Sequence, residues 1–436
     1  MDDDRLSELP DSLILTILSL LNMNDVVMTT LLSKRWKNRW TTVPCLRFDP
    51  PFKHNKWVEY SKFVSGALAQ WKGAKIMKLT IIFHGHGSSP STDIDSWLRF
   101  AIEKQVEKLL VVFKNDDAYL VPQCLYSCSS ITELSLSKCS LKIERNVQWN
   151  QLKRLAIYQT DALSGDVMNQ ILVGAPLLEE LVLLVLWGFE ISENFNIRST
   201  SLKILEINGC NVKAEAELRI CAPNLLSLEV SASVCGSCLL YVPSLTTATL
   251  CFDDYSITRE DMAPLGMFHQ VFHSIRHVEN VSLSNWSIQF LADMKENDMP
   301  VQFPNAEFLK ISVVKDQQMH DVLVVLESFP KLKTLIVHEF GRIHNSVASE
   351  MTSRGPSLLH LQKVESFVLE CHGSISPLVR FLLENAHVLQ KMVVDLYGQR
   401  RDKEAYISAL KELLGMRRSS PYAEVIISPR SLAFKF

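Results

Sequence analysis

The sequence lacks a long hydrophobic run and a strong excess of either charge. Its longest apolar stretches, such as residues 181–187, are far shorter than the roughly 20 residues that a membrane-spanning helix requires. The formal net charge is −3, and basic and acidic residues are interspersed along the chain. This balance does not favour binding to nucleic acid or to an anionic membrane, so we expect neither as a partner.

A dense cysteine framework is also missing. The ten cysteines are scattered, and several of them fall within predicted strands (Cys210, Cys251 and Cys371). Such spacing is typical of buried free thiols in a reducing compartment. The chain begins with Asp2, Asp3 and Asp4, which is unlike a secretory signal or a transit peptide. We therefore expect the cytoplasm, the nucleus or both.

Catalytic motifs are absent from the sequence. It has no Gly-x-x-x-x-Gly-Lys phosphate loop, no nucleophile elbow and no His-Glu-x-x-His element. Cys235 and Cys238 have the spacing of a redox pair or half a zinc site, and His84 and His86 could face one side of a strand. Neither pair has further ligands at a matching distance. We therefore expect no catalytic residue, no metal and no cofactor.

A repeated pattern fills most of the chain. A proline or polar residue is followed by Leu-x-x-Leu-x-Leu, with clear copies at 176–183, 223–230 and 330–337. The next-to-last apolar position recurs as thirteen anchors, and (392 − 79)/12 gives a mean spacing of about 26 residues, which is typical of leucine-rich repeats. The anchors are Leu79, Leu109, Leu134, Leu155, Leu181, Leu205, Leu228, Ala248, Val281, Leu309, Leu335, Phe367 and Met392.

Each repeat predicts a short strand with one apolar face. Leu228 and Val230 would share one face, with Glu229 on the other. One strand cannot bury its apolar face alone, so neighbouring repeats stack and share a core. The fold class predicted is therefore α/β, a solenoid with parallel strands on its concave face and helices and loops outside. We expect the outward positions of the strands to contact a target protein, with five candidates: Tyr158, Glu206, Glu229, Lys310 and His338.

Residues 5–44 depart from this repeat and predict three short helices. Apolar residues at helical spacing follow Pro10, which suits a first helical turn. Asn24 or Asp25 could cap a second helix, and Ser33 could cap a third that buries Trp36 and Trp40. The basic residues among these tryptophans could suggest nucleic-acid binding, but a solvated helix face is the better interpretation.

The run Leu9-Pro10-Asp11-Ser12-Leu13-Ile14, together with Ser33-Lys34-Arg35-Trp36, resembles an F-box of the plant type. This resemblance implies docking onto a Skp1-like adaptor, and through it onto a cullin and a RING protein. By the same resemblance, the candidate adaptor-binding residues are Leu9, Pro10, Leu13, Ile14, Leu18, Val26 and Leu31.

The carboxyl-terminal region, from Leu361 to about Ser428, resembles the FBD domain of plant F-box proteins. Ser376 and Pro377 predict the start of a helix, Asp402 that of another, and residues 423–428 a last strand. The domains expected are an F-box (1–46), a helical connector that caps the solenoid (47–75), leucine-rich repeats (76–360) and an FBD region (361–436).

The combined resemblance, to plant F-box/leucine-rich-repeat/FBD proteins, implies a non-catalytic substrate receptor of an SCF-type ubiquitin ligase. Two alternatives stay open. The chain could be an adaptor-bound scaffold without a role in ubiquitylation, or its repeats could enclose a small molecule as a co-receptor. Some plant F-box hormone receptors hold a polyphosphate, and the concave positions here lack the lysine and arginine cluster which that requires. The hormone-receptor hypothesis is therefore disfavoured.

Overall fold

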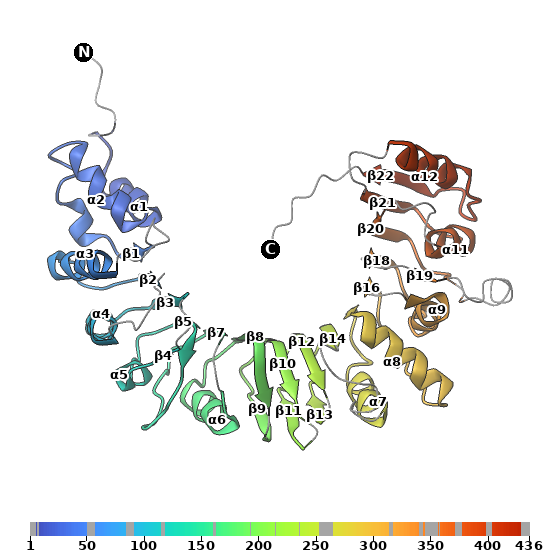
Figure 1. Ribbon diagram of the computed structural model, residues 1–436, viewed down its shortest axis with the longest axis horizontal. Coiled ribbons are helices and arrows are strands. Elements are labelled where there is room, and N and C mark those ends of the chain that lie inside the picture. The colour runs from blue at the N-terminus through green and yellow to red at the C-terminus, as the bar shows by residue number, and fades with distance from the viewer. Residues whose placement is uncertain are drawn as a thin grey trace, which may run out of the picture. The chain divides into compact units, whose positions relative to one another are not determined.

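The protein forms two compact units, residues 1–210 (unit 1) and residues 211–436 (unit 2). The computed structural model describes residues 6, 8–49, 57–83, 91–114, 118–159, 163–191, 193–213, 215–234, 236–252, 265–313, 317–339, 343–344, 356, 358–370, 377–397 and 403–428. Each unit is built on a sheet with helices along one of its faces (Figure 1). The fold class is α/β, as the sequence predicts.

In unit 1 the strand order of the main sheet follows the chain, β1-β2-β3-β5-β7-β8-β10. The pairs from β1 to β8 are parallel. The short strands β4 and β6 pair separately, also in parallel. The strands are β1 (Cys45–Phe48), β2 (Lys78–Phe83), β3 (Lys108–Phe113), β4 (Tyr119–Leu120), β5 (Glu133–Ser137), β6 (Cys139–Ser140), β7 (Arg154–Tyr158), β8 (Glu180–Ile191), β9 (Phe195–Arg198) and β10 (Ile204–Val212).

The predicted anchors set the register of this sheet. Leu79 lies beside Leu109, Leu109 beside Leu134, Leu134 beside Leu155, and Leu155 beside Leu181. These five side chains are at most 2% exposed. Because side chains alternate along a strand, the anchors and the residues two places further on form the core against the helices.

The helices of unit 1 form two groups. Two belong to the amino-terminal module, and the others lie along one side of the sheet (Figure 1). They are α1 (Asp11–Leu20), α2 (Met23–Met28), α3 (Trp57–Gln70), α4 (Ser91–Glu103), α5 (Gln123–Tyr126) and α6 (Gly165–Gly174). The connector was expected to cover the first edge of the sheet, and β1 is the strand at that edge. Helix α3 instead contacts α4 in the helix layer.

Two predictions for the amino-terminal module are wrong. The cap of α2 is Asn22, whose side chain accepts a hydrogen bond from the amide of Asn24 at 3.4 Å. The third α-helix does not form: residues 34–38 are turns, followed by a short 3-10 helix, Arg39–Thr42. A helix this short has little stability of its own, and tertiary contacts decide its conformation. Trp36 and Trp40 are nevertheless buried, as predicted.

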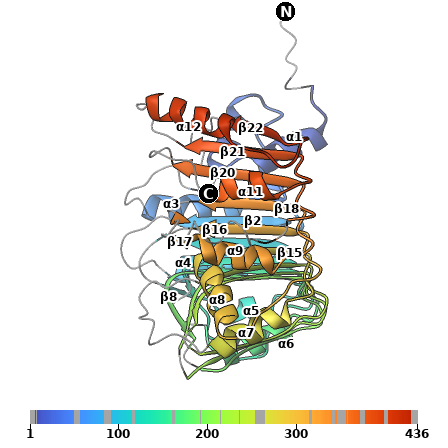
Figure 2. The ribbon, with the colours of Figure 1, turned by 90° about the vertical axis from the view of Figure 1, so that its right-hand side faces the viewer.

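Unit 2 contains the strand order β12-β14-β15-β16-β18-β20-β21-β22, again parallel throughout. Figure 2 shows β20, β21 and β22 stacked one above another. The strands are β11 (Glu217–Cys221), β12 (Ser227–Val234), β13 (Ser237–Tyr241), β14 (Thr247–Phe252), β15 (Asn280–Leu283), β16 (Phe308–Val313), β17 (Gln317–Gln318), β18 (Thr334–Glu339), β19 (Ile343–His344), β20 (Lys363–Glu370), β21 (Lys391–Tyr397) and β22 (Glu424–Ser428).

One anchor in unit 2 was placed wrongly. Val364, not Phe367, lies in register with Leu335 and with Met392. Phe367 pairs with Val394 beyond an irregularity in β20, where three residues of one strand oppose two of its partner. This is the geometry of a β-bulge, which shifts the apolar position by one residue.

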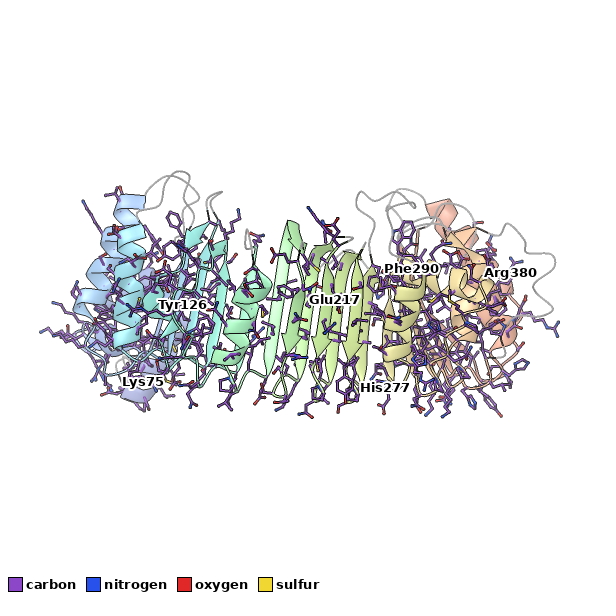
Figure 3. All side chains as sticks on the ribbon, turned by 90° about the horizontal axis from the view of Figure 1, so that it is seen from below. Lys75, Tyr126, Glu217, His277, Phe290 and Arg380 are labelled. Atoms are coloured by element: carbon purple, nitrogen blue, oxygen red, sulfur yellow. The ribbon has the colours of Figure 1, made fainter. Side chains whose placement is uncertain are left out.

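The helices of unit 2 are α7 (Leu265–Ser274), α8 (Asn285–Glu296), α9 (Met319–Glu327), α11 (Pro377–Asn385) and α12 (Lys403–Gly415). The last two match the helices predicted after Ser376 and Asp402, and β22 matches the predicted last strand. Arg380 of α11, labelled in Figure 3, forms a 3.1 Å ion pair with Glu412 of α12. This contact joins the two helices at their exposed sides.

Candidate docking surfaces

The amino-terminal module carries an unusual number of exposed apolar side chains. In residues 6–32, apart from Ser7, the chain exposes seven of them: Leu6, Leu13, Ile17, Leu20, Met28, Leu31 and Leu32. Leu20 is 80% exposed and Leu31 is 77% exposed. Apolar surface gathered in one short segment of a folded protein indicates a site that binds a partner.

Helix α1 shows why these side chains are not buried within the chain. Its sequence is apolar on more than one side. Ile14 and Leu18 point into the module and are fully buried. Leu13, Ile17 and Leu20 follow at spacings of four and three residues, so they share a second, exposed face. A helix that is apolar on two faces needs a neighbour for each, and the module supplies only one.

The structure divides the seven predicted adaptor-binding residues into two groups. Pro10, Leu13 and Leu31 are exposed, and Leu9 is half-buried. The other three, Ile14, Leu18 and Val26, are completely buried. Their side chains hold the helices together from within, and contact of these three with an adaptor stays a prediction. The pattern did not single out Ile17, Leu20 and Met28, which are also exposed, although the spacing from Leu13 could have identified the first two.

An ion-pair cluster fixes the position of α1. Asp11, in its first turn, accepts from Arg35 and from Arg39, each at 2.8 Å. The hydrogen bond from Arg35, aided by the charge of Arg39, lowers the pKa of the Asp11 carboxyl below its ordinary value. Nearby, the indole of Trp36 donates to the carbonyl of Leu6 at 3.3 Å. Residues 35–39 therefore link the start of α1 to the rest of the module.

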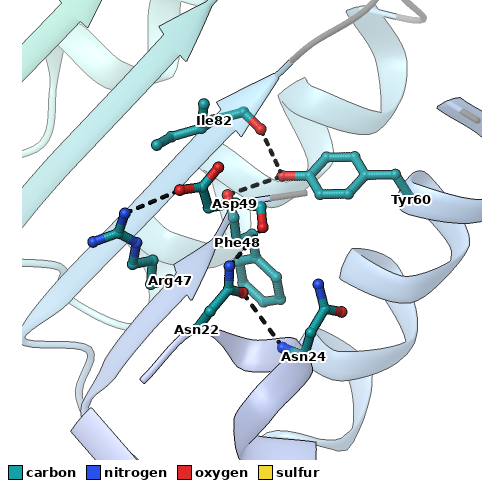
Figure 4. A network of polar contacts seen from close by, with 7 residues as sticks. All are labelled: Asn22, Asn24, Arg47, Phe48, Asp49, Tyr60 and Ile82. Carbon is teal, nitrogen blue, oxygen red and sulfur yellow. Dashed lines mark hydrogen bonds and ion pairs between the residues drawn. The ribbon is translucent and has the colours of Figure 1, made fainter. Parts of the chain in front are cut away.

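A second network attaches the module to the first strands of the sheet (Figure 4). The hydroxyl of Tyr60, on α3, lies 3.1 Å from the carbonyl oxygens of both Phe48 and Ile82. Asn22 donates to the carbonyl of Asp49 at 2.5 Å. Burial, and secondarily the charge of Asp49, raise the pKa of Tyr60, so its hydroxyl stays a donor at neutral pH. These contacts bridge the amino-terminal module, α3 and the sheet.

The predicted target-binding residues lie on five strands, opposite the buried anchors. Tyr158 and Glu206 belong to β7 and β10 of unit 1, and Glu229, Lys310 and His338 to β12, β16 and β18 of unit 2. All five side chains are half-buried. Their position on the sheet face agrees with the strand pattern, and contact with a target stays a prediction. The prediction missed the apolar residues on the same face of unit 1, which are described below.

Of the cysteine and histidine pairs noted in the sequence, the structure describes only Cys238. Cys238 is buried, whereas Cys235, His84 and His86 lie outside the described residues. Within the described ranges, no three His, Cys, Asp or Glu side chains are placed to hold a metal ion. None of the helices described there is long and apolar enough to cross a membrane.

Comparison with known families follows this geometry. The F-box domain model matches residues 6–48, the segment with the exposed apolar side chains. The family model described as At1g61320/AtMIF1, LRR domain, matches residues 68–420. That match extends through the region predicted as FBD, so the boundary proposed at residue 361 stays a prediction.

Similar proteins from Arabidopsis thaliana cover most of the chain. The FBD-associated F-box protein At5g22730 is 26% identical over 98% of this chain and 94% of its own length. The F-box/LRR-repeat protein 13 is 25% identical over 97% of this chain and 96% of its own. The F-box/LRR-repeat protein At3g03360 is 28% identical over 78% and 71%. With the leucine-rich-repeat model matching well over half of its residues, the chain belongs to the plant F-box/leucine-rich-repeat/FBD protein family.

Proposed function

We propose that the protein is a non-catalytic substrate-receptor subunit of a Skp1–cullin–F-box ubiquitin ligase. Its F-box binds a Skp1-like adaptor, which links it to a cullin and a RING protein. Its leucine-rich repeats hold a target protein for ubiquitylation. The observation that carries this proposal is the exposed apolar set of residues 6–32, which lies within the segment matched by the F-box model.

In this proposal the chain positions a target protein and performs no chemical step itself. The partner proteins of such a ligase bring the reactive thiols, and a receptor raises the effective concentration of a target lysine near them. A receptor of this kind works best when its two docking surfaces are rigidly joined. The hydrogen bonds of Tyr60 and Asn22 supply such a junction between the F-box and the first strands of the sheet.

The adaptor face that we propose is built on the exposed side of α1 and the segment after α2. Leu13, Ile17 and Leu20 form its helical part, and Leu31 and Leu32 its second part. Pro10 precedes α1 and is exposed, so it belongs to the same face. Leu9 is included as a half-buried neighbour.

Two measurements test the proposal. The first is the affinity of the purified full chain for a plant Skp1-like adaptor, by isothermal titration; saturable binding with one site is expected. The second is a reconstituted reaction with adaptor, cullin, RING protein, ubiquitin and its activating and conjugating enzymes. A protein bound to the repeats should gain ubiquitin only when the chain is present. If the adaptor binds and a bound protein never gains ubiquitin, the chain is a scaffold and the proposal is refuted.

A further inference from the structure

Part of the open sheet face of unit 1 is apolar, unlike an ordinary solvated sheet face. The helices lie along the other side of the strands (Figure 1). On β2, β3, β7 and β8, the residues that alternate with the buried anchors include six apolar ones. We call them the apolar face: Ile82, Leu110, Val112, Ala156, Val182 and Leu184.

Register brings these side chains together. Ile82 lies beside Val112, and Ala156 beside Val182. Tyr158 lies beside Leu184 and extends the surface. Between the two apolar blocks, β5 contributes only small residues, Ser135 and Ser137. Ala156 and Val182 are buried, and the other four side chains are half-buried. The apolar parts that stay exposed on an uncovered sheet face are expected to bind apolar groups.

The sequence of the strands in unit 1 accounts for this surface. Strands β2, β3 and β8 have continuous apolar runs, such as Leu109–Phe113, instead of the alternation expected of a sheet with one solvated face. In unit 2, strands β12, β14, β15 and β16 alternate, whereas β18 and β21 contain apolar runs. The positions that correspond to Leu110 hold polar residues on the first four, Glu229 on β12, Thr249 on β14, Ser282 on β15 and Lys310 on β16, and apolar residues on the other two, Ile336 on β18 and Val393 on β21.

A row of charged residues runs along one side of the apolar face. It consists of Lys78, Lys108, Glu133, Arg154 and Glu180, one residue from each strand in register. Ion pairs join Lys108 to Glu133 at 2.6 Å and Arg154 to Glu180 at 2.9 Å. Three basic and two acidic side chains leave an excess of one positive charge (3 − 2 = 1). Lys78, at the end of the row, is exposed, and none of the described residues forms an ion pair with it.

From these observations we infer that the apolar face binds a short segment of a target protein with aliphatic or aromatic side chains and an acidic residue placed to meet Lys78. This inference rests on the proposed function and names the kind of target segment. Target selection is then assigned to the strands of unit 1, next to the F-box. The acidic residue fixes the direction of the bound segment, because the other four charges of the row compensate one another.

The test uses the purified full chain and a phage-displayed library of short random peptides. The expected outcome is enrichment of peptides that combine several large apolar residues with an acid. The best peptide is then synthesised with a fluorescent label, and its affinity is measured by fluorescence polarisation. Leu110→Ser and Leu184→Ser should each weaken it at least about tenfold, as loss of a central apolar contact does. Lys78→Glu, a change at an exposed position, should weaken binding of the peptide. It should not weaken binding of a version of the peptide that lacks the acidic residue.

The matched control is Ile336→Ser. Ile336 holds on β18 the position that Leu110 holds on β3, and both are half-buried. It should leave the peptide affinity unchanged. Thermal unfolding of every variant establishes that it is folded, and Lys78→Glu gives a readout that does not depend on changing a partly buried residue.

Several outcomes overturn the inference. The first is the absence of enriched peptides. The second is equal peptide affinity of the wild type, Leu110→Ser, Leu184→Ser and Lys78→Glu. The third is a peptide affinity that only Ile336→Ser lowers. Self-association of the chain that Leu110→Ser abolishes would assign the face to a second copy and also overturns it. Adaptor affinity, measured on the wild type and on the same variants, separates the two proposals. If the wild type does not bind the adaptor, the ligase function is refuted and the peptide result still stands.

Discussion

Replacing the two most exposed leucines of the F-box separates adaptor contact from folding. Leu20 is 80% exposed and Leu31 is 77% exposed, so Leu20→Ala with Leu31→Ala removes apolar surface that the chain itself does not use. The folded state loses almost no internal contact. We expect the free energy of unfolding of the double variant to change by less than about 0.5 kcal/mol for each site.

The effect on the adaptor should be much larger. Complete burial of a leucine side chain contributes about 1.5–3 kcal/mol. Scaling by the exposed fractions of Leu20 and Leu31, and allowing for the methyl group that alanine keeps, gives about 1–2 kcal/mol for each leucine covered by the adaptor. The pair therefore contributes about 2–4 kcal/mol, which weakens binding roughly 30- to 900-fold.

Ile14→Ala is the matched control, because Ile14 lies on the same helix and is 0% exposed. It should lower the free energy of unfolding by about 2–5 kcal/mol, the usual cost of a cavity. Adaptor affinity should fall only as far as the folded fraction of the module falls. The assays are isothermal titration with the adaptor and denaturant unfolding. Unchanged affinity in the folded double variant, or strong loss in folded Ile14→Ala, would refute this division of roles.

Two further predictions concern the contacts that position the F-box. Tyr60→Phe removes the donor shared by Phe48 and Ile82 and should lower the free energy of unfolding by about 1–3 kcal/mol, whereas Tyr422→Phe, at an 81% exposed position, should leave it unchanged. Equal effects in denaturant unfolding would contradict the network of Figure 4. The lowered pKa of Asp11 means that its ion pairs stabilise the fold above the ordinary carboxyl pKa, and that this contribution is lost as the pH falls through the lower folded-state value. Asp11→Asn should therefore be less stable than the wild type at neutral pH, with the difference closing below about pH 4 in a pH series of unfolding curves; a difference that persists there would count against the linkage.

The repeat pattern predicted the strands well because every repeat must bury an anchor. The spacing of the leucines therefore follows the sheet register directly, as the pairs from Leu79 to Leu181 show. The anchor in β20 was assigned to Phe367 and not to Val364, because this strand has an apolar residue on each side of the bulge. Which of them comes into register with Leu335 and Met392 depends on the neighbouring strand.

The candidate sites were harder to predict. Helical spacing shows which residues share a face of α1, but it does not show which face the rest of the module covers. Ile14 and Leu13 look alike in sequence, yet one is fully buried and the other is 48% exposed. The apolar face of unit 1 had a visible signal, the continuous apolar runs of β2, β3 and β8.

Hydrogen–deuterium exchange of the full chain with and without a Skp1-like adaptor tests the central claim most directly. The account predicts slower exchange of backbone amides in residues 11–32 on adaptor binding, with the strands from β2 to β8 unchanged and still free for a target. Unchanged exchange in residues 11–32, or protection confined to the sheet, would contradict it.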